Sequence, residues 1–146
     1  GDWGNLPSGE VYLAPWEEKS NGIIVVDGSF AGIGMLEEPI TIEVVNGFAE
    51  KITGGKQAEK LIGMLDKVGR DARAIAEFGV GTNYLAQLCG EILEDEKVYG
   101  TIHIAVGNNV SMGGNVNVKS HLDGLVKAPD VYLDGVLMMK EGVLLD

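Results

Sequence analysis

The sequence predicts an α+β domain with a largely antiparallel β-sheet and two main helices. Apolar and polar residues alternate through residues 40–45 and again through 48–53, and the Asn46-Gly47 pair between them is typical of a tight hairpin turn. Residues 58–68 instead carry apolar side chains at helical spacing, with lysines and glutamates on the other side. Strands that follow each other through turns, with only two helical segments among them, favour an antiparallel sheet.

The remaining strands are predicted from short apolar or alternating segments bounded by glycine and proline. They lie at residues 11–14, 22–27, 73–80, 101–107 and 119–124, with a final hairpin over 130–142. Residues 28–34 contain several glycines but no phosphate-binding spacing and no cation, so we expect a strand edge and loop there. The glycine-rich segment 107–115 is typical of a loop that shapes a substrate pocket. Residues 1–9 are predicted to be a turn-rich entry.

The second helix is predicted around Cys89, the one cysteine in the chain. Its apolar stripe would contain Leu85, Leu88, Cys89, Ile92 and Leu93, which fall at helical spacing. This pattern predicts a core thiol rather than a nucleophile. Because a single cysteine cannot form an internal disulfide, a reducing cytoplasm is the expected compartment.

Length and charge limit the classes of function. The chain has 146 residues and a formal charge of −11, which fits a single domain over residues 1–146 and argues against nucleic acid or an anionic membrane as a partner. The sequence contains no apolar run of about 20 residues that would span a membrane, and we expect no signal peptide. A chain of this length buries a core without a structural metal, so a bound metal would be functional.

Both histidines of the chain fall on predicted strands that could contribute to one metal site. His103 alternates with branched apolar residues along 101–107, so its side chain is expected to point away from the apolar face, into a surface kept open by small neighbours. His121 and Asp123 are two residues apart on an extended segment, which places imidazole and carboxylate side by side. Glu77 is likewise directed away from the apolar face of its own strand.

Each of these side chains also has an ordinary explanation. A strand glutamate such as Glu10 is commonly a solvated surface residue, Glu96 belongs to a run of charges, and a lone histidine can be a partly buried residue with satisfied hydrogen bonds. A His-x-Asp pair also arises by chance in an acidic protein. The joint placement on non-apolar faces of separate strands is what a shared site requires. The candidate metal ligands are Glu10, Glu77, Glu96, His103, His121 and Asp123.

Several motifs occur in a fixed order along the chain. They are Asn5-Leu-Pro-Ser-Gly-Glu10-Val with Ala14-Pro15, Ala76-Glu77-Phe-Gly-Val-Gly-Thr-Asn83, Asp95-Glu96-Lys97 before Gly100-Thr-Ile-His103-Ile-Ala-Val-Gly107, and Ser120-His121-Leu-Asp123. As an ordered set they resemble the C-terminal half of the thermophilic metallo-aminopeptidase family, which includes aminopeptidase T and the leucyl aminopeptidase-related proteins. The resemblance implies that residues 1–146 are the C-terminal metal-binding domain of a larger two-domain protein.

The resemblance also implies a cytoplasmic, metal-dependent aminopeptidase, a hydrolase in which metal-bound water attacks the N-terminal peptide bond of a small peptide. The six candidate ligands would hold two divalent ions, namely cobalt, zinc or manganese, with Glu77 bridging them. Family members form dimers, which implies a homodimer, and the apolar segment 136–139 could contribute to its contact. An N-terminal domain would lie upstream.

Two features of the sequence depart from that family. Residues 1–146 do not include the large N-terminal α/β domain of that family, and Val110, Ser111 and Met112 occupy the region in which members place a tyrosine. Metal binding is therefore better supported than peptidase activity, and two other functions stay open. One is an iron(II) ring-cleaving dioxygenase, because dihydroxypyridine dioxygenases resemble the same family and use histidines and carboxylates that include a His-x-Asp pair. The other is a non-catalytic metal-binding or oligomerisation domain.

Overall fold

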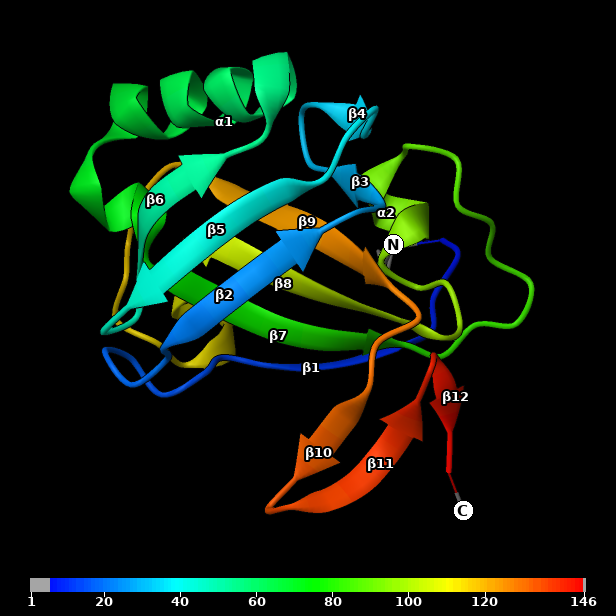
Figure 1. Ribbon diagram of the computed structural model, residues 1–146. Coiled ribbons are helices and arrows are strands. Elements are labelled where there is room, and N and C mark those ends of the chain that lie inside the picture. Colours follow the sequence, from blue (N-terminus) through cyan, green and yellow to red (C-terminus); the bar gives the residue numbers. More distant parts are fainter. Residues whose placement is uncertain (1–5, 146) are drawn as a thin grey trace, which may run out of the picture.

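A computed structural model describes residues 6–145, so the first five residues of the predicted turn-rich entry lie outside it. Within the described residues, three antiparallel sheets and two α-helices confirm the predicted α+β class (Figure 1). The strands are β1 (Glu10–Leu13), β2 (Gly22–Val26), β3 (Ser29–Phe30), β4 (Gly34–Met35), β5 (Ile40–Val45), β6 (Phe48–Thr53), β7 (Ile75–Gly81), β8 (Thr101–Gly107), β9 (His121–Lys127), β10 (Val131–Leu133), β11 (Val136–Lys140) and β12 (Val143–Leu144). The helices are α1 (Gly55–Val68) and α2 (Ile92–Asp95), with short 3₁₀ turns at Arg70–Arg73 and Val110–Met112.

The largest sheet has the strand order β1-β7-β8-β9-β3-β4. The three-stranded sheet β2-β5-β6 packs against one face of it, and α1 closes the same core (Figure 1). The core takes apolar side chains from both sheets and from the helix, among them Val26, Phe30, Ile42, Val44, Leu61, Leu65, Ile75 and Val106. The other face of the large sheet is not covered by this second sheet, and it is called the free face below.

The hairpin and the first helix, which have the strongest patterns in the sequence, are both present as predicted. Strands β5 and β6 pair through a turn in which Asn46 and Gly47 both have positive φ, at 48° and 79°, as a tight hairpin requires. Helix α1 buries Ala58, Leu61 and Leu65, which belong to the predicted apolar stripe.

The prediction of a helix around Cys89 is wrong. Only residues 92–95 are helical, Leu85 is 88% exposed, and Cys89 is exposed instead of being a core thiol. In this segment, side-chain oxygens accept the hydrogen bonds that backbone carbonyls would accept in a helix. Asn83 Oδ1 accepts a hydrogen bond from the Leu85 N–H at 2.8 Å, and Asp95 Oδ1 accepts one from the Cys89 N–H at 2.8 Å. Such local bonds compete with a helix because they satisfy the same backbone donors.

A register shift in β7 places Ile75 on the opposite side of the strand from the one that simple alternation predicts. Simple alternation places Ile75 and Glu77 on the same side of the strand. A bulge between them instead sets Ile75 opposite Val106 and Glu77 opposite Ala105, so Ile75 joins the apolar core while Glu77 stays on the free face.

The C-terminal strands β10, β11 and β12 form a separate sheet that projects from the body (Figure 1). Tyr132, Leu133 and Val136 are exposed on this sheet, whereas Met139 is fully buried. The predicted homodimer contact through this segment stays a prediction. No helix in residues 6–145 has both the length and the apolar character needed to cross a membrane.

Candidate metal centre

Strand pairing gathers five of the six predicted ligands on the free face of the large sheet. The opposed residues in β1, β7, β8 and β9 are Glu10 with Gly81, Gly79 with His103, Glu77 with Ala105, Ala105 with Asp123, and Gly107 with His121. Opposed residues share a face, and so do residues two apart on one strand. Four neighbouring strands therefore present their polar side chains to one place, and Glu96 joins them from the segment after α2.

Glu77 occupies the centre of this cluster. Its Oε1 lies 3.2 Å from His103 Nε2, and its Oε2 lies 3.1 Å from His121 Nε2. Glu10 Oε2 is 3.4 Å from His103 Nε2, and Asp123 Oδ1 is 3.5 Å from His121 Nε2. One carboxylate thus links the two histidines, and each histidine also faces a second carboxylate.

Three overlapping groups in the cluster could each hold a metal ion. They are Glu10, Glu77 and His103; Glu77, His121 and Asp123; and Glu96, His103 and Asp123. The structure therefore brings together all six residues predicted from the sequence. Each group combines one imidazole with two carboxylates, a donor set that suits a divalent transition metal. His103 is fully buried, so the open surface predicted around it is not present.

The hydrogen bonding of the cluster fits a cation. Among the described residues, Glu10 Oε2 and Asp123 Oδ1 are buried without a hydrogen-bond partner, although buried polar atoms are nearly always bonded. His121 Nδ1 lies 2.6 Å from the carbonyl oxygen of Asn108 and can donate to it, which leaves the lone pair on Nε2. A divalent ion would satisfy the free carboxylate oxygens and accept that lone pair.

The ionisation of the metal-free cluster follows from its internal ion pairs. Burial opposes the charge of Glu77, but hydrogen bonds to His103 and His121 outweigh it and lower the pKa of Glu77 to about 2. The carboxylates of Asp123 and Glu77 raise the pKa of His121 to about 11, and Glu77 raises the pKa of His103 against the effect of its burial. Without a metal, protons on the histidines balance the carboxylates, and a metal ion would take their place.

Lys97 is a buried residue of the site that the sequence did not single out. Its Nζ lies 2.9 Å from Glu10 Oε1 and is also ion-paired with Glu96. Burial lowers the pKa of Lys97, but these two carboxylates outweigh it and raise that pKa, whereas burial raises the pKa of Glu96. Within the run of charges at 94–97, Asp95, Glu96 and Lys97 are buried, and Glu96 and Lys97 belong to the cluster.

A pocket of about 540 Å³ opens onto the cluster, a volume in the range of small-molecule sites. Five of the six predicted ligands line it, and His103 lies behind them. The remaining wall includes Tyr12, Ile92, Leu93, Met112 and Lys119. The 3₁₀ turn that carries Met112 belongs to the glycine-rich loop, which therefore lines a pocket, as the sequence predicts.

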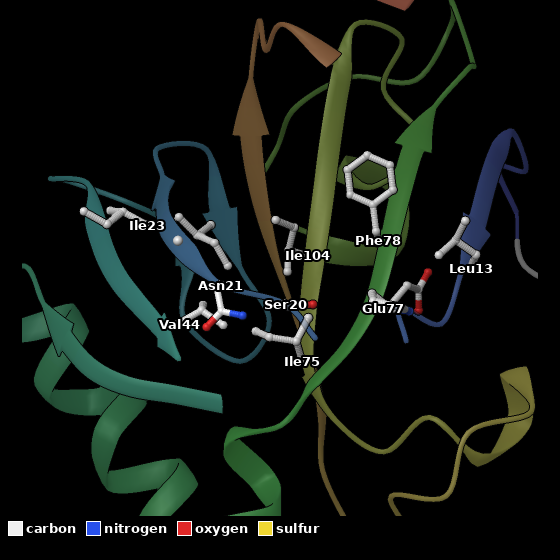
Figure 2. Close-up of a pocket in the computed structure, with 12 residues that line it drawn as sticks. Leu13, Ser20, Asn21, Ile23, Val44, Ile75, Glu77, Phe78 and Ile104 are labelled. Atoms are coloured by element: carbon white, nitrogen blue, oxygen red, sulfur yellow. The ribbon is translucent and has the colours of Figure 1, made fainter. Parts of the chain in front are cut away.

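A second pocket, of about 450 Å³, lies between the six-stranded sheet and the β2-β5-β6 sheet (Figure 2). Ile23 and Val44 line it from one sheet, and Phe78 and Ile104 from the other. Glu77 is the one ionisable side chain among its lining residues. This pocket lacks the donors for metal chemistry, so the polar pocket is the candidate site.

Comparison with known proteins identifies the family. A family model described as 2,5-dihydroxypyridine 5,6-dioxygenase matches residues 1–146. The chain belongs to this family. A 2,5-dihydroxypyridine 5,6-dioxygenase from Pseudomonas putida is 28% identical over 155 aligned residues, which cover 97% of this chain and 44% of that protein. The chain therefore spans less than half the length of this relative.

Solved structures give the same result. The structure of 2,5-dihydroxypyridine dioxygenase from Pseudomonas putida matches with a TM-score of 0.86 and 26% identity, covering 95% of this chain and 44% of that one. Wild-type AmpT from Thermus thermophilus matches with a TM-score of 0.75 and 24% identity, covering 97% of this chain and 40% of that one. At this identity, the second match shows a shared fold alone.

The family match corrects the aminopeptidase prediction. The chain is a member of the dioxygenase family, so the expected hydrolase, aminopeptidase and metalloprotease functions are wrong. The two groups share a fold, as the match to AmpT shows, and the ordered motifs that resembled the aminopeptidases lie on that fold. The ring-cleaving dioxygenase, kept open beside the hydrolase, is the alternative that the comparisons favour. Membership in this family implies a metal cofactor, and the polar cluster could hold one.

Proposed function

We propose that this chain is the metal-binding domain of an iron(II)-dependent ring-cleaving dioxygenase that acts on a dihydroxylated pyridine. The observation that carries the proposal is the buried cluster of carboxylates and histidines at the floor of a pocket, in a chain whose whole length matches the dioxygenase family. Iron(II) suits a mixed imidazole and carboxylate site with open positions. The earlier expectation of two cobalt, zinc or manganese ions came from the aminopeptidase resemblance.

The residues of the chain would hold the metal through Glu77, His121 and Asp123, the group that contains the most exposed candidate ligand. The side chain of His121 is 32% exposed, compared with 10% for Glu77 and 9% for Asp123. When bound, iron(II) supplies the redox chemistry by which molecular oxygen reacts with an aromatic ring. The Asn108 carbonyl fixes the ring of His121 through Nδ1, so Nε2 stays directed at the cluster.

The pocket walls supply substrate binding. Ile92, Leu93 and Met112 form an apolar wall suited to the face of a flat heteroaromatic ring. The Lys119 side chain is a cation at the same pocket, and it would attract the acidic hydroxyl groups of a dihydroxypyridine. Apolar walls also limit water near the cluster, which strengthens the electrostatic interactions inside it.

Metal content is the first test. The chain, purified without chelator and loaded anaerobically with iron(II), is expected to retain iron after desalting, and Glu77→Gln is expected to lose most of it. Glu43→Gln is the matched control, because Glu43 is an exposed carboxylate on β5, outside the cluster. Equal iron in the Glu77 variant and the wild type would contradict the ligand assignment.

Oxygen uptake is the second test. The iron-loaded chain is expected to consume oxygen when 2,5-dihydroxypyridine is added, with loss of the ultraviolet absorbance of the aromatic ring. A short peptide amide is the negative control substrate. Iron retention without oxygen uptake, in the chain or in a longer protein that contains it, would refute the dioxygenase function while leaving metal binding intact.

A further inference from the structure

Lys97 is a lysine buried within a cluster of metal-binding side chains. Its side chain is 1% exposed, and its ammonium group is ion-paired with Glu10 at 2.9 Å and with Glu96. Both carboxylates belong to groups that could hold a metal ion. The ammonium group therefore competes with a metal ion for the same acceptors, and an ammonium cannot itself be a ligand because it has no lone pair.

The backbone fixes Lys97 in this position. Its N–H donates to the Glu94 carbonyl at 3.0 Å, and its own carbonyl accepts a hydrogen bond from the Asn83 N–H at 2.8 Å. Gly81 in β7 allows the segment to approach the sheet, since a Cβ there would lie 2.0 Å from the Val98 carbonyl oxygen. The base of the side chain is thus held against the sheet beneath the cluster.

The charges of the cluster limit how many cations it can hold. Its four carboxylates, Glu10, Glu77, Glu96 and Asp123, carry four negative charges when ionised. The Lys97 ammonium and one divalent ion supply three positive charges, which leaves a net charge of −1. Two divalent ions and the ammonium would supply five and leave +1; the second ion would also have to share Glu10 and Glu96 with the ammonium, so two like charges would lie close together in a buried site.

We propose that Lys97 is the internal cation of the site: it takes the place of a second metal ion, holds Glu10 and Glu96, and limits the cluster to one divalent ion at Glu77, His121 and Asp123. This role makes Lys97 a positioning residue, and it rests on the proposed metal-binding function. The ligand group is then the one at the pocket opening, where His121 is the most exposed of the ligands. Lys97 would thus set the number of bound metal ions without being a metal ligand itself.

Counting bound ions tests the role of Lys97. Anaerobic calorimetric titration of the chain with Mn²⁺, followed by elemental analysis after dialysis, is expected to give one ion per chain. Lys97→Met keeps the length of the side chain and removes its charge, so this variant is expected to bind a second ion between Glu10 and Glu96. Lys97→Arg keeps the charge and is expected to bind one ion.

The outcomes separate this inference from the proposed function. Two ions in the wild type, or one ion in Lys97→Met, would overturn the role of Lys97 and leave metal binding in place. No ion in the wild type would overturn both. Thermal unfolding gives a second readout: Mn²⁺ is expected to raise the melting temperature of Lys97→Met more than that of the wild type, because the added ion replaces a lost charge. If Lys97→Met does not fold, the ion counts of the wild type and Lys97→Arg decide, and two ions in either would overturn the inference.

Discussion

Replacing Gly79 by alanine should disable the metal centre without touching a ligand. Gly79 is paired with His103 across β7 and β8, and a Cβ at this position would lie 2.0 Å from His103 Nε2. The ring would have to retreat to an ordinary contact of 3.4 Å, a shift of about 1.4 Å. His103 is fully buried, with Glu10 and Glu77 within 3.4 Å of the same nitrogen, so the ring has little room to move.

The size of the effect follows from this geometry. Overpacking a buried position costs about 1–3 kcal/mol of folding stability. The displaced ring would also lose its contact of 3.2 Å with Glu77, one of the proposed ligands. Moving Nε2 away from Glu77 should therefore weaken metal binding by about 10- to 100-fold or more, the range seen when the support of a ligand is lost.

The assay combines chemical unfolding with metal titration. Gly63→Ala is the matched control, because Gly63 lies in α1 with nothing within 4 Å of an added Cβ, and alanine there should stabilise the helix by about 0.5–1 kcal/mol. Wild-type metal affinity and stability in Gly79→Ala would refute the packing argument. A loss of stability with unchanged metal affinity would show that His103 does not position the metal ligands.

Three further outcomes test the fold around the site. Hydrogen bonds from the Asn115 backbone N–H, and then from the side chains of Asn115 and Asn109, lower the pKa of Glu17 to about 2. Their contribution is present above the ordinary pKa of about 4.5 and is lost as the pH falls toward 2, so the protection factor of the Asn115 amide against hydrogen exchange should fall over that range in the wild type and not in Glu17→Gln. Leu65→Ala should lower the free energy of unfolding by about 2–5 kcal/mol in urea titration, since Leu65 is fully buried in the main core; a change below about 1 kcal/mol would contradict that packing. Cys89 should react with a thiol reagent at a similar rate in native and unfolded protein, whereas protection in the native state would restore the core assignment that the structure rejects.

Local patterns in the sequence determined most of the strands and the direction of several ligands. Alternation is a property of each strand alone, so it placed His103, Glu77 and the His121–Asp123 pair on polar faces before any pairing was known. The Asn46-Gly47 turn was equally local, because its φ angles are set within the turn itself. The α+β class followed from these elements.

Helical spacing near Cys89 was a misleading local pattern. Asn83 and Asp95 bind the backbone of that segment, and the resulting loop lets α2 carry Glu96 to the metal cluster. The bulge in β7 likewise depends on its pairing with β8, which alternation within one strand cannot reveal. The first difference arises because nearby side chains satisfy the backbone of the segment, and the second because a strand distant in sequence pairs with β7.

The tertiary structure alone decided which ligands meet and what lies among them. The register of β1, β7, β8 and β9 sets the separation of Glu10, Glu77, His103 and His121, and no single segment contains that information. Burial of Lys97 is also non-local, since it requires the whole cluster of carboxylates to offset the cost of removing a charge from water. The sequence by itself therefore determined the kinds of donor in the site, and the packing of four strands determined how they are arranged.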